Sequence, residues 1–147
     1  MKIKVLIALD YDPTAQKVAE VGFLFAKTME AEVILVHVVV NLVNYSLSYL
    51  NMGPLVLESG TNLKDVSQIF LDKTKKHLGD ETIKTVVMEG DFAKSILIAT
   101  KDLQADVIVM GSHSQKWLEN ILIGSVTEKV LQQTSIPMFI VPTKKQN

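Results

Sequence analysis

The sequence predicts an α/β fold in which a five-stranded, open parallel sheet carries helices on both faces. Three observations predict this fold. Five apolar runs of strand length alternate with longer amphipathic stretches, most of the runs are nearly continuous rather than alternating, and 147 residues suit one domain over residues 1–147. The strand order expected for such a chain is 3-2-1-4-5.

The first third of the chain supplies a strand, a helix and a second strand. Ile3–Leu9 is nearly continuous aliphatic sequence, which is typical of a strand buried on both faces. Asp12 then offers an N-cap and Pro13 suits the first helical position, ahead of small and apolar residues at helical spacing over 14–29. Val33–Val40 predicts the second strand.

Residues 41–60 interrupt this alternation with few charges and two tyrosines, Tyr45 and Tyr49. A loop of this length inside a compact domain is usually either functional or disordered. Its apolar content disfavours disorder, so we expect the loop to pack on, or cover, another part of the protein.

The remainder of the chain continues the alternation of helix and strand. Gly79 follows a helical pattern as a stop signal, and Asp91 precedes the next one as an N-cap. The predicted elements are a helix over Leu63–Leu78 started by Asn62, a strand over Ile83–Met88, a helix from Asp91 through Lys101, a strand over Asp106–Met110, a helix over Val126–Gln133 and a strand over Pro137–Val141.

Composition excludes several kinds of site. All 15 basic residues are lysine, cysteine is absent and the formal net charge is -1. Without cysteine there is no disulfide, thiolate metal site or cysteine nucleophile. Without arginine there is no bidentate fork for phosphate or guanine, and near-neutral charge argues against a nucleic-acid partner. Because no apolar run approaches the length of a signal or membrane-spanning segment, we expect a cytoplasmic protein without a membrane partner.

The expected topology predicts where a ligand binds. Open parallel sheets bind ligands beyond the carboxyl ends of the strands, where the strand order reverses. Here that crevice lies between the first and fourth strands, which end near Leu9 and Met110. The loop after the first strand holds no glycine, which excludes the glycine-rich dinucleotide fingerprint and the P-loop. Glycine occurs instead at Gly111 and Gly124, and Ser125 opens a helix whose free amides suit an anion, although turn glycines and an ordinary helix cap explain the same residues.

Several stretches together resemble the universal stress protein family. They are the aspartate after the first strand, Val36–Val38, Val109–His113, Ile123–Val130 and Ile136–Val141. The specific part is the family's nucleotide motif, G-x2-G-x9-G-(S/T). Its first two glycines are separated by two residues, its second and third by nine, and a serine or threonine follows the third. Gly111, Ser114, Gly124 and Ser125 match this spacing, with Ser114 in place of the second glycine. The resemblance covers the chain from the first strand to the fifth and implies a Rossmann-like fold of the adenine nucleotide alpha hydrolase type.

The resemblance also implies an adenine-nucleotide site for ATP or AMP. Ala8 and Leu9 would form walls of the adenine pocket, and Asp10 would accept hydrogen bonds from the ribose hydroxyls. Val38 would meet the adenine edge through its backbone, and Met110 would pack on the base. The ribose and phosphate path would be lined by Gly111, His113, Ser114, Gly124, Ser125, Val126 and Thr127.

Ser114 leaves the ligand open between ATP, AMP and none. If this position needs a positive φ, a serine costs on the order of 1 kcal/mol there, whereas its hydroxyl could instead donate to a phosphate. A triphosphate would need Mg²⁺ to offset its charge, because no arginine is present. Two alternatives are a slow ATP hydrolase or phosphotransferase, with His113 as thin support, and an interaction protein that has lost nucleotide binding. His37, inside an apolar strand, is interpreted as a core or crevice-wall residue.

The fifth strand lies at the edge of the predicted sheet and therefore has unpaired backbone groups. Pairing Ile136–Val141 with its copy in a second chain would satisfy those groups and bury Met138 and Ile140. The resemblance also implies dimerisation through this strand. We therefore expect a homodimer with a regulatory role in a stress response and a protein partner that the sequence does not identify.

Overall fold

The five strands form a single parallel sheet with the order β3-β2-β1-β4-β5, as predicted. The computed structural model describes residues 2–40, 63–112 and 124–143, so the predicted 41–60 loop and the predicted site residues His113 and Ser114 lie outside the described residues. The elements are β1 (Lys4–Ala8), α1 (Ala15–Thr28), β2 (Glu32–Val39), α4 (Leu63–Leu78), β3 (Lys84–Glu89), α5 (Phe92–Asp102), β4 (Val107–Gly111), α6 (Ser125–Gln133) and β5 (Met138–Val141).

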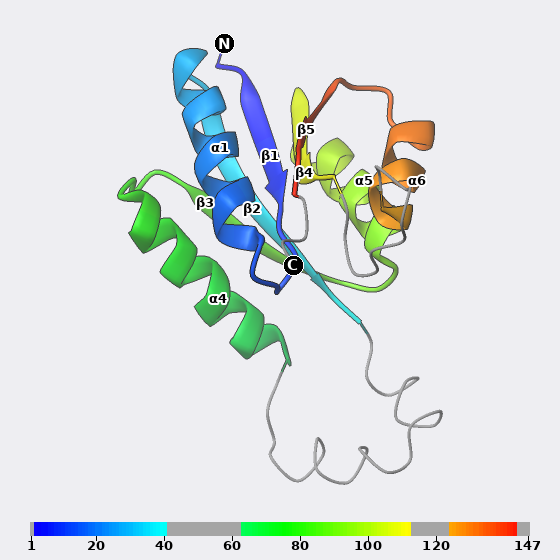
Figure 1. Ribbon diagram of the computed structural model, residues 1–147, viewed down its shortest axis with the longest axis horizontal. Helices are drawn as coiled ribbons and strands as arrows, with labels where there is room; N and C mark the ends of the chain where they lie inside the picture. The colour runs from blue at the N-terminus through cyan, green and yellow to red at the C-terminus, as the bar shows by residue number, and fades with distance from the viewer. Residues whose placement is uncertain (1, 41–62, 113–123, 144–147) are drawn as a thin grey trace, which may run out of the picture.

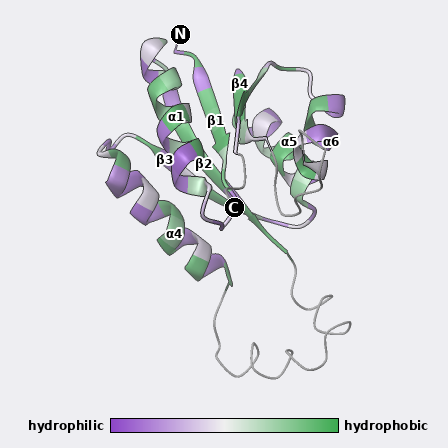
Figure 2. Cartoon of the chain, viewed as in Figure 1, coloured by the Kyte–Doolittle hydropathy of each residue, from purple (hydrophilic) through white to green (hydrophobic). Residues whose placement is uncertain are grey.

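Helices cover both faces of the sheet, with α1 and α4 on one side and α5 and α6 on the other (Figure 1). Alternate residues of β1 enter two separate cores: Val5 and Ile7 pack beneath α1, and Leu6 packs beneath α5 and α6. In Figure 2 the strands are largely hydrophobic, whereas α4 alternates between hydrophobic and hydrophilic residues. Across the described segments, no helix is both long enough and apolar enough to cross a membrane.

The start of α1 differs from the prediction. The N-cap residue is Thr14 and the helix begins at Ala15, so Asp12 is not the cap and Pro13 is not the first helical residue. The Asp12 carboxylate instead accepts hydrogen bonds from the Thr14 amide at 2.7 Å and the Thr14 hydroxyl at 2.5 Å. The side chain of Asp12 thus stabilises a turn that precedes the helix, as aspartate often does.

Two other predicted helix signals, Asp91 and Gly79, are confirmed, whereas Asn62 lies outside the described residues. The Asp91 carboxylate accepts a hydrogen bond from the Lys94 amide at 2.9 Å and caps α5. Gly79 ends α4 with a φ of +73°, a conformation that favours glycine. Apart from the start of α1, which lies two residues after Pro13, the ends of the nine described elements differ from the predicted ones by no more than one residue.

Close packing of α1 on the sheet depends on Gly22. A Cβ atom at this position would lie 2.9 Å from Ile7 Cδ1 and 3.0 Å from Val109 Cγ1. Glycine therefore lets the helix approach β1 and β4 closely. These are the two strands whose carboxyl ends form the predicted crevice.

Candidate functional site

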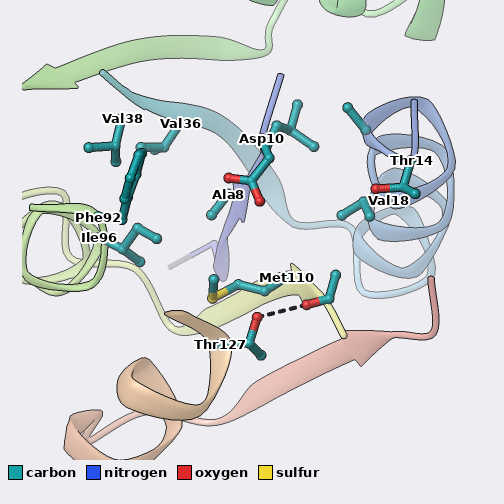
Figure 3. A pocket seen from close by; sticks show the side chains of 13 residues that line it. Ala8, Asp10, Thr14, Val18, Val36, Val38, Phe92, Ile96, Met110 and Thr127 are labelled. Atoms are coloured by element: carbon teal, nitrogen blue, oxygen red, sulfur yellow. Dashed lines mark hydrogen bonds between the residues drawn. The ribbon is translucent and has the colours of Figure 1, made fainter. Parts of the chain in front are cut away.

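A small cavity lies at the predicted crevice, beyond the carboxyl ends of β1 and β4 (Figure 3). Its volume is about 20 Å³, which is room for about one water molecule. The side chains around it come from both strands, from β2, and from the first turns of three helices. The lining residues are Ala8, Leu9, Asp10, Thr14, Ala15, Val18, Val36, Val38, Phe92, Ile96, Met110, Gly111 and Thr127.

Most of the predicted site residues that the structure describes meet at this cavity. They are Ala8, Leu9, Asp10, Val38, Met110, Gly111 and Thr127. Ser125 and Val126 line a groove of about 320 Å³ that runs along α6 beside the first turn of α5 and shares Phe92 with the cavity. Gly124 is the buried N-cap residue of α6, and its amide donates to the Ser112 carbonyl at 2.6 Å.

The sequence reasoning missed the lining residues that lie in the first turns of α1 and α5 and inside β2. They are Thr14, Ala15, Val18, Val36, Phe92 and Ile96. A usable signal existed for some of them. Helices that follow strands of a parallel sheet begin near the strand carboxyl ends, so their first turns face the same crevice. Phe92, directly after the predicted cap Asp91, is the clearest case.

Asp10 places a carboxylate at the rim of the cavity. Burial raises the pKa of Asp10 above its usual value of 3.8, and the negative charge of Asp12 raises this pKa further, whereas His37 lowers it. Within the described segments, the Asp10 carboxylate has no hydrogen-bond donor. Its oxygens are acceptors that no described residue uses, which suits a ligand that carries hydroxyl groups.

The backbone around Asp10 is fixed by hydrogen bonds. The Leu9 amide donates to the Val36 carbonyl at 2.9 Å, and the Asp12 amide donates to the Asp10 carbonyl at 2.9 Å. The Leu9 carbonyl lies 2.7 Å from Nδ1 of His37, which is 8% exposed. His37 is thus a buried wall residue, as interpreted from the sequence.

On the other side of the cavity, Gly111 allows three segments to meet. A Cβ at Gly111 would lie 3.1 Å from Val18 Cγ2 and 3.2 Å from Thr143 Cγ2. The Thr127 hydroxyl donates to the Gly111 carbonyl at 2.8 Å, the dashed line in Figure 3. Because this hydroxyl is buried and already bonded, the Thr127 side chain serves to join α6 to β4.

A second groove, also of about 320 Å³, adjoins the cavity on the side of Asp10 and α4, and this is the space called the groove from here on. Three residues, Asp10, Val38 and Phe92, line both spaces. The groove is at the lower end of the size range of small-molecule sites. The remaining residues that line it are Tyr11, Asp12, His37, Val39, Val40, Leu63, Val66 and Ser67.

The described residues do not form a metal centre of their own. Across 2–40, 63–112 and 124–143, no three His, Cys, Asp or Glu residues lie close enough together to hold an ion. Asp10 and Asp12 are the carboxylates that line the groove, and Asp12 is already bonded to Thr14. A Mg²⁺ ion here would therefore take most of its ligands from phosphate oxygens and water, as Mg²⁺ commonly does.

Comparison with known proteins agrees with the predicted fold and with the predicted family. The profile of the universal stress protein family matches residues 1–142. Universal stress protein MJ0531 of Methanocaldococcus jannaschii is 31% identical over 97% of this chain and 84% of its own length. Universal stress protein MJ0577 of the same organism is 28% identical over 96% of this chain and 95% of its own.

Solved structures agree as well. The structure of MJ0577 superimposes with a TM-score of 0.76 and covers 99% of both chains. A universal stress protein solved in complex with cAMP is 16% identical, covers 95% of both chains and has a TM-score of 0.63, a likeness of fold. The match along residues 1–142 and the similarity to MJ0531 over nearly the whole chain establish that this chain belongs to the universal stress protein family.

Proposed function

We propose that this protein binds an adenine nucleotide, ATP or AMP, in the crevice beyond β1 and β4 and acts as a dimeric regulator in a stress response. The observation that carries the proposal is the cavity itself. Separate strands and helices bring together apolar walls and one carboxylate to which no described residue donates, at the place where parallel sheets of this topology bind ligands.

The chemistry around the cavity suits the parts of a nucleotide. Ala8, Val38 and Met110 offer apolar surface for the base, and Asp10 offers an acceptor for the ribose hydroxyls. The phosphates would lie at the N-terminus of α6, where the exposed Ser125 and free backbone amides attract an anion. The base would take up the groove together with the cavity, because the cavity alone holds about one water molecule. His113 and Ser114 stay predicted members of the phosphate path.

A related protein supports the class of ligand. One universal stress protein that shares this fold is solved in complex with cAMP, an adenine nucleotide. Both ATP and AMP are consistent with the crevice. With ATP, Mg²⁺ would neutralise part of the phosphate charge, since the chain has no arginine.

The binding experiment begins with the purified protein. Denaturing it and identifying any released nucleotide by mass spectrometry names the ligand, and calorimetric titration with AMP, ATP and ATP with Mg²⁺ measures its affinity. We expect binding of at least one of these. Absence of binding at millimolar concentrations of all of them would contradict the proposal, and steady phosphate release from ATP would favour the hydrolase alternative.

A charge at Ser125 tests the position of the phosphates. Ser125→Glu puts a carboxylate at the first position of α6, where a negative charge suits the helix, so the fold should keep its stability. The same charge should weaken AMP binding by about tenfold or more through repulsion, while adenosine binding stays unchanged. Ser125→Gln is the uncharged control. Equal AMP affinity in all three proteins would rule out phosphates at this helix end.

We further propose that the dimer forms through β5. This strand is at the edge of the sheet, with β4 as its one strand neighbour among the described residues. Its residues Met138 and Ile140 are partly exposed, and its backbone groups on the outer side are open to pairing.

A further inference from the structure

His37 is a buried polar residue to which the proposed binding site gives no role. It is 8% exposed and lies in β2, among the aliphatic residues of the sheet. Burying a polar group is unfavourable unless it is hydrogen-bonded. What the imidazole bonds to is therefore informative.

The partner of His37 is the backbone next to Asp10. Nδ1 of His37 lies 2.7 Å from the carbonyl oxygen of Leu9, the residue that precedes Asp10. A carbonyl oxygen is an acceptor, so the proton must be on Nδ1 and the imidazole donates. This bond joins the middle of β2 to the end of β1, just where the chain turns into the cavity.

Aromatic rings hold the other side of Asp10. Phe70 in α4 packs edge-on against the His37 ring, with 5.4 Å between ring centroids. The same Phe70 contacts the ring of Tyr11, the residue that follows Asp10, at 4.9 Å. His37 thus holds the backbone immediately before Asp10, and Tyr11 is the residue immediately after it. The rings of His37 and Tyr11 both contact the ring of Phe70.

We propose that His37 is a positioning residue that fixes the Asp10 carboxylate for recognition of the ribose hydroxyls, through its hydrogen bond to the Leu9 carbonyl. This inference rests on the proposed function, since it names a residue that positions Asp10 within the same proposed nucleotide site. His37 and Asp10 line one groove, so the two side chains also face a common space.

Electrostatics act in the same direction as the geometry. Burial and the negative charge of Asp12 raise the pKa of Asp10, and His37 lowers it. His37 therefore favours the ionised form of Asp10, which accepts hydrogen bonds from both ribose hydroxyls. Asp12 is the charged group that opposes it in this groove.

Substitutions at His37 separate the hydrogen bond from the bulk of the ring. His37→Leu removes the donor and leaves an apolar side chain. His37→Asn keeps an N–H donor near the position of Nδ1, whereas His37→Gln carries its donor farther out, near Nε2. The pair of amide variants keeps the test decisive if the leucine variant does not fold. Urea unfolding of each variant measures any general loss of stability.

The first readout needs no nucleotide. The Asp12 amide donates to the Asp10 carbonyl at 2.9 Å, so hydrogen exchange of this amide reports the order of the turn. We expect His37→Leu and His37→Gln to exchange on the order of tenfold faster here, with His37→Asn near the wild type. Unchanged exchange at Asp12 in a folded His37→Leu protein would overturn the positioning role.

The second readout is ribose discrimination, measured as the ratio of affinities for ATP and 2′,3′-dideoxy-ATP. We expect the wild type to bind ATP on the order of tenfold more tightly than 2′,3′-dideoxy-ATP. Asp10→Asn removes the carboxylate itself, and we expect the affinity ratios of His37→Leu and His37→Gln to approach the ratio of that variant. We expect His37→Asn to keep most of the preference. Wild-type discrimination in a folded His37→Leu protein, or equal loss in His37→Asn and His37→Gln, would overturn the inference while the proposed function stands. A third outcome is that the wild type binds neither nucleotide, while the Asp12 amide exchanges faster in His37→Leu than in the wild type. That outcome would overturn nucleotide binding and ribose recognition, and His37 would remain only an anchor of the turn.

Discussion

At the scale of single residues, Asp10 is held where its negative charge is disfavoured. Burial and the neighbouring Asp12 raise its pKa above 3.8, and His37 offsets part of this effect. Because the raised pKa belongs to the folded state, the native protein binds this proton more tightly than the unfolded chain. Between the unfolded and folded pKa values, the contribution of Asp10 to stability therefore falls as the pH rises.

Asp10→Asn should for this reason stabilise the protein at pH 7, by about 0.5–2 kcal/mol, while it weakens nucleotide binding. The gain should shrink as the pH falls through the raised pKa toward 3.8, because Asp10 is then protonated in the wild type as well. Urea unfolding at several pH values measures this difference.

The matched control is Asp72→Asn, which removes an exposed carboxylate on α4. We expect its stability to stay within about 0.5 kcal/mol of the wild type at each pH. A loss of stability at pH 7 in Asp10→Asn would contradict the electrostatic account of the site.

At the scale of elements, the crevice depends on how closely α1 approaches β1 and β4. The helix lies near the sheet because Gly22 leaves no room for a side chain against Ile7 and Val109. The wall of the cavity at Gly111 is close-packed in a similar way, because the absence of a side chain there lets Val18 and Thr143 pack against the backbone.

Gly22→Ala should destabilise the protein by about 1–2 kcal/mol. Overpacking costs about 1–3 kcal/mol, and the better helix propensity of alanine offsets up to about 1 kcal/mol of this. Chemical denaturation measures the change. Leu24→Ala on the same helix is the control, because Leu24 is 67% exposed and its loss should cost little. Equal or greater stability of Gly22→Ala would show that α1 is free to shift.

Sequence patterns predicted the elements well where a local signal decided their ends. The apolar spacing and Gly79 defined α4, and Asp91 capped α5 as expected. The start of α1 was wrong, because the Asp12 side chain bonds to Thr14 and holds a turn instead of capping the helix. That choice depends on side-chain geometry, which hydrophobic spacing does not encode.

At the scale of the whole molecule, the strand order follows from alternating strands and helices, and a cavity lies at the crevice that this order predicts. The small size of the cavity was not predictable, and neither was the hydrogen bond that the Thr127 hydroxyl donates to the Gly111 carbonyl. Both depend on the packing of helices that are distant in sequence. Phe92 differs from both, because the first turn of a helix that follows a strand is expected to face the crevice.

The same topology leaves β5 at one edge, which carries the prediction of a dimer. The strand is held to its own chain by the stacking of Phe139 on Phe25, with ring centroids 4.2 Å apart. Ile140→Lys places a charge in the partly exposed part of the strand and should convert a dimer into a monomer in light scattering at micromolar concentration.

Leu131→Lys is the control for that experiment, since it introduces the same charge at an exposed apolar residue of α6. We expect it to stay dimeric. A wild-type protein that is already monomeric at this concentration would rule out the dimer.

Nuclear magnetic resonance shows directly whether an adenine nucleotide binds beyond β1 and β4. Amide signals of the ¹⁵N-labelled protein are followed as AMP is added. We expect saturable shifts at the amides of Ala8, Asp10, Val38, Gly111 and Ser125, with little change at the amino ends of the strands. No shifts at millimolar AMP, or shifts confined to the amino ends of the strands, would contradict it.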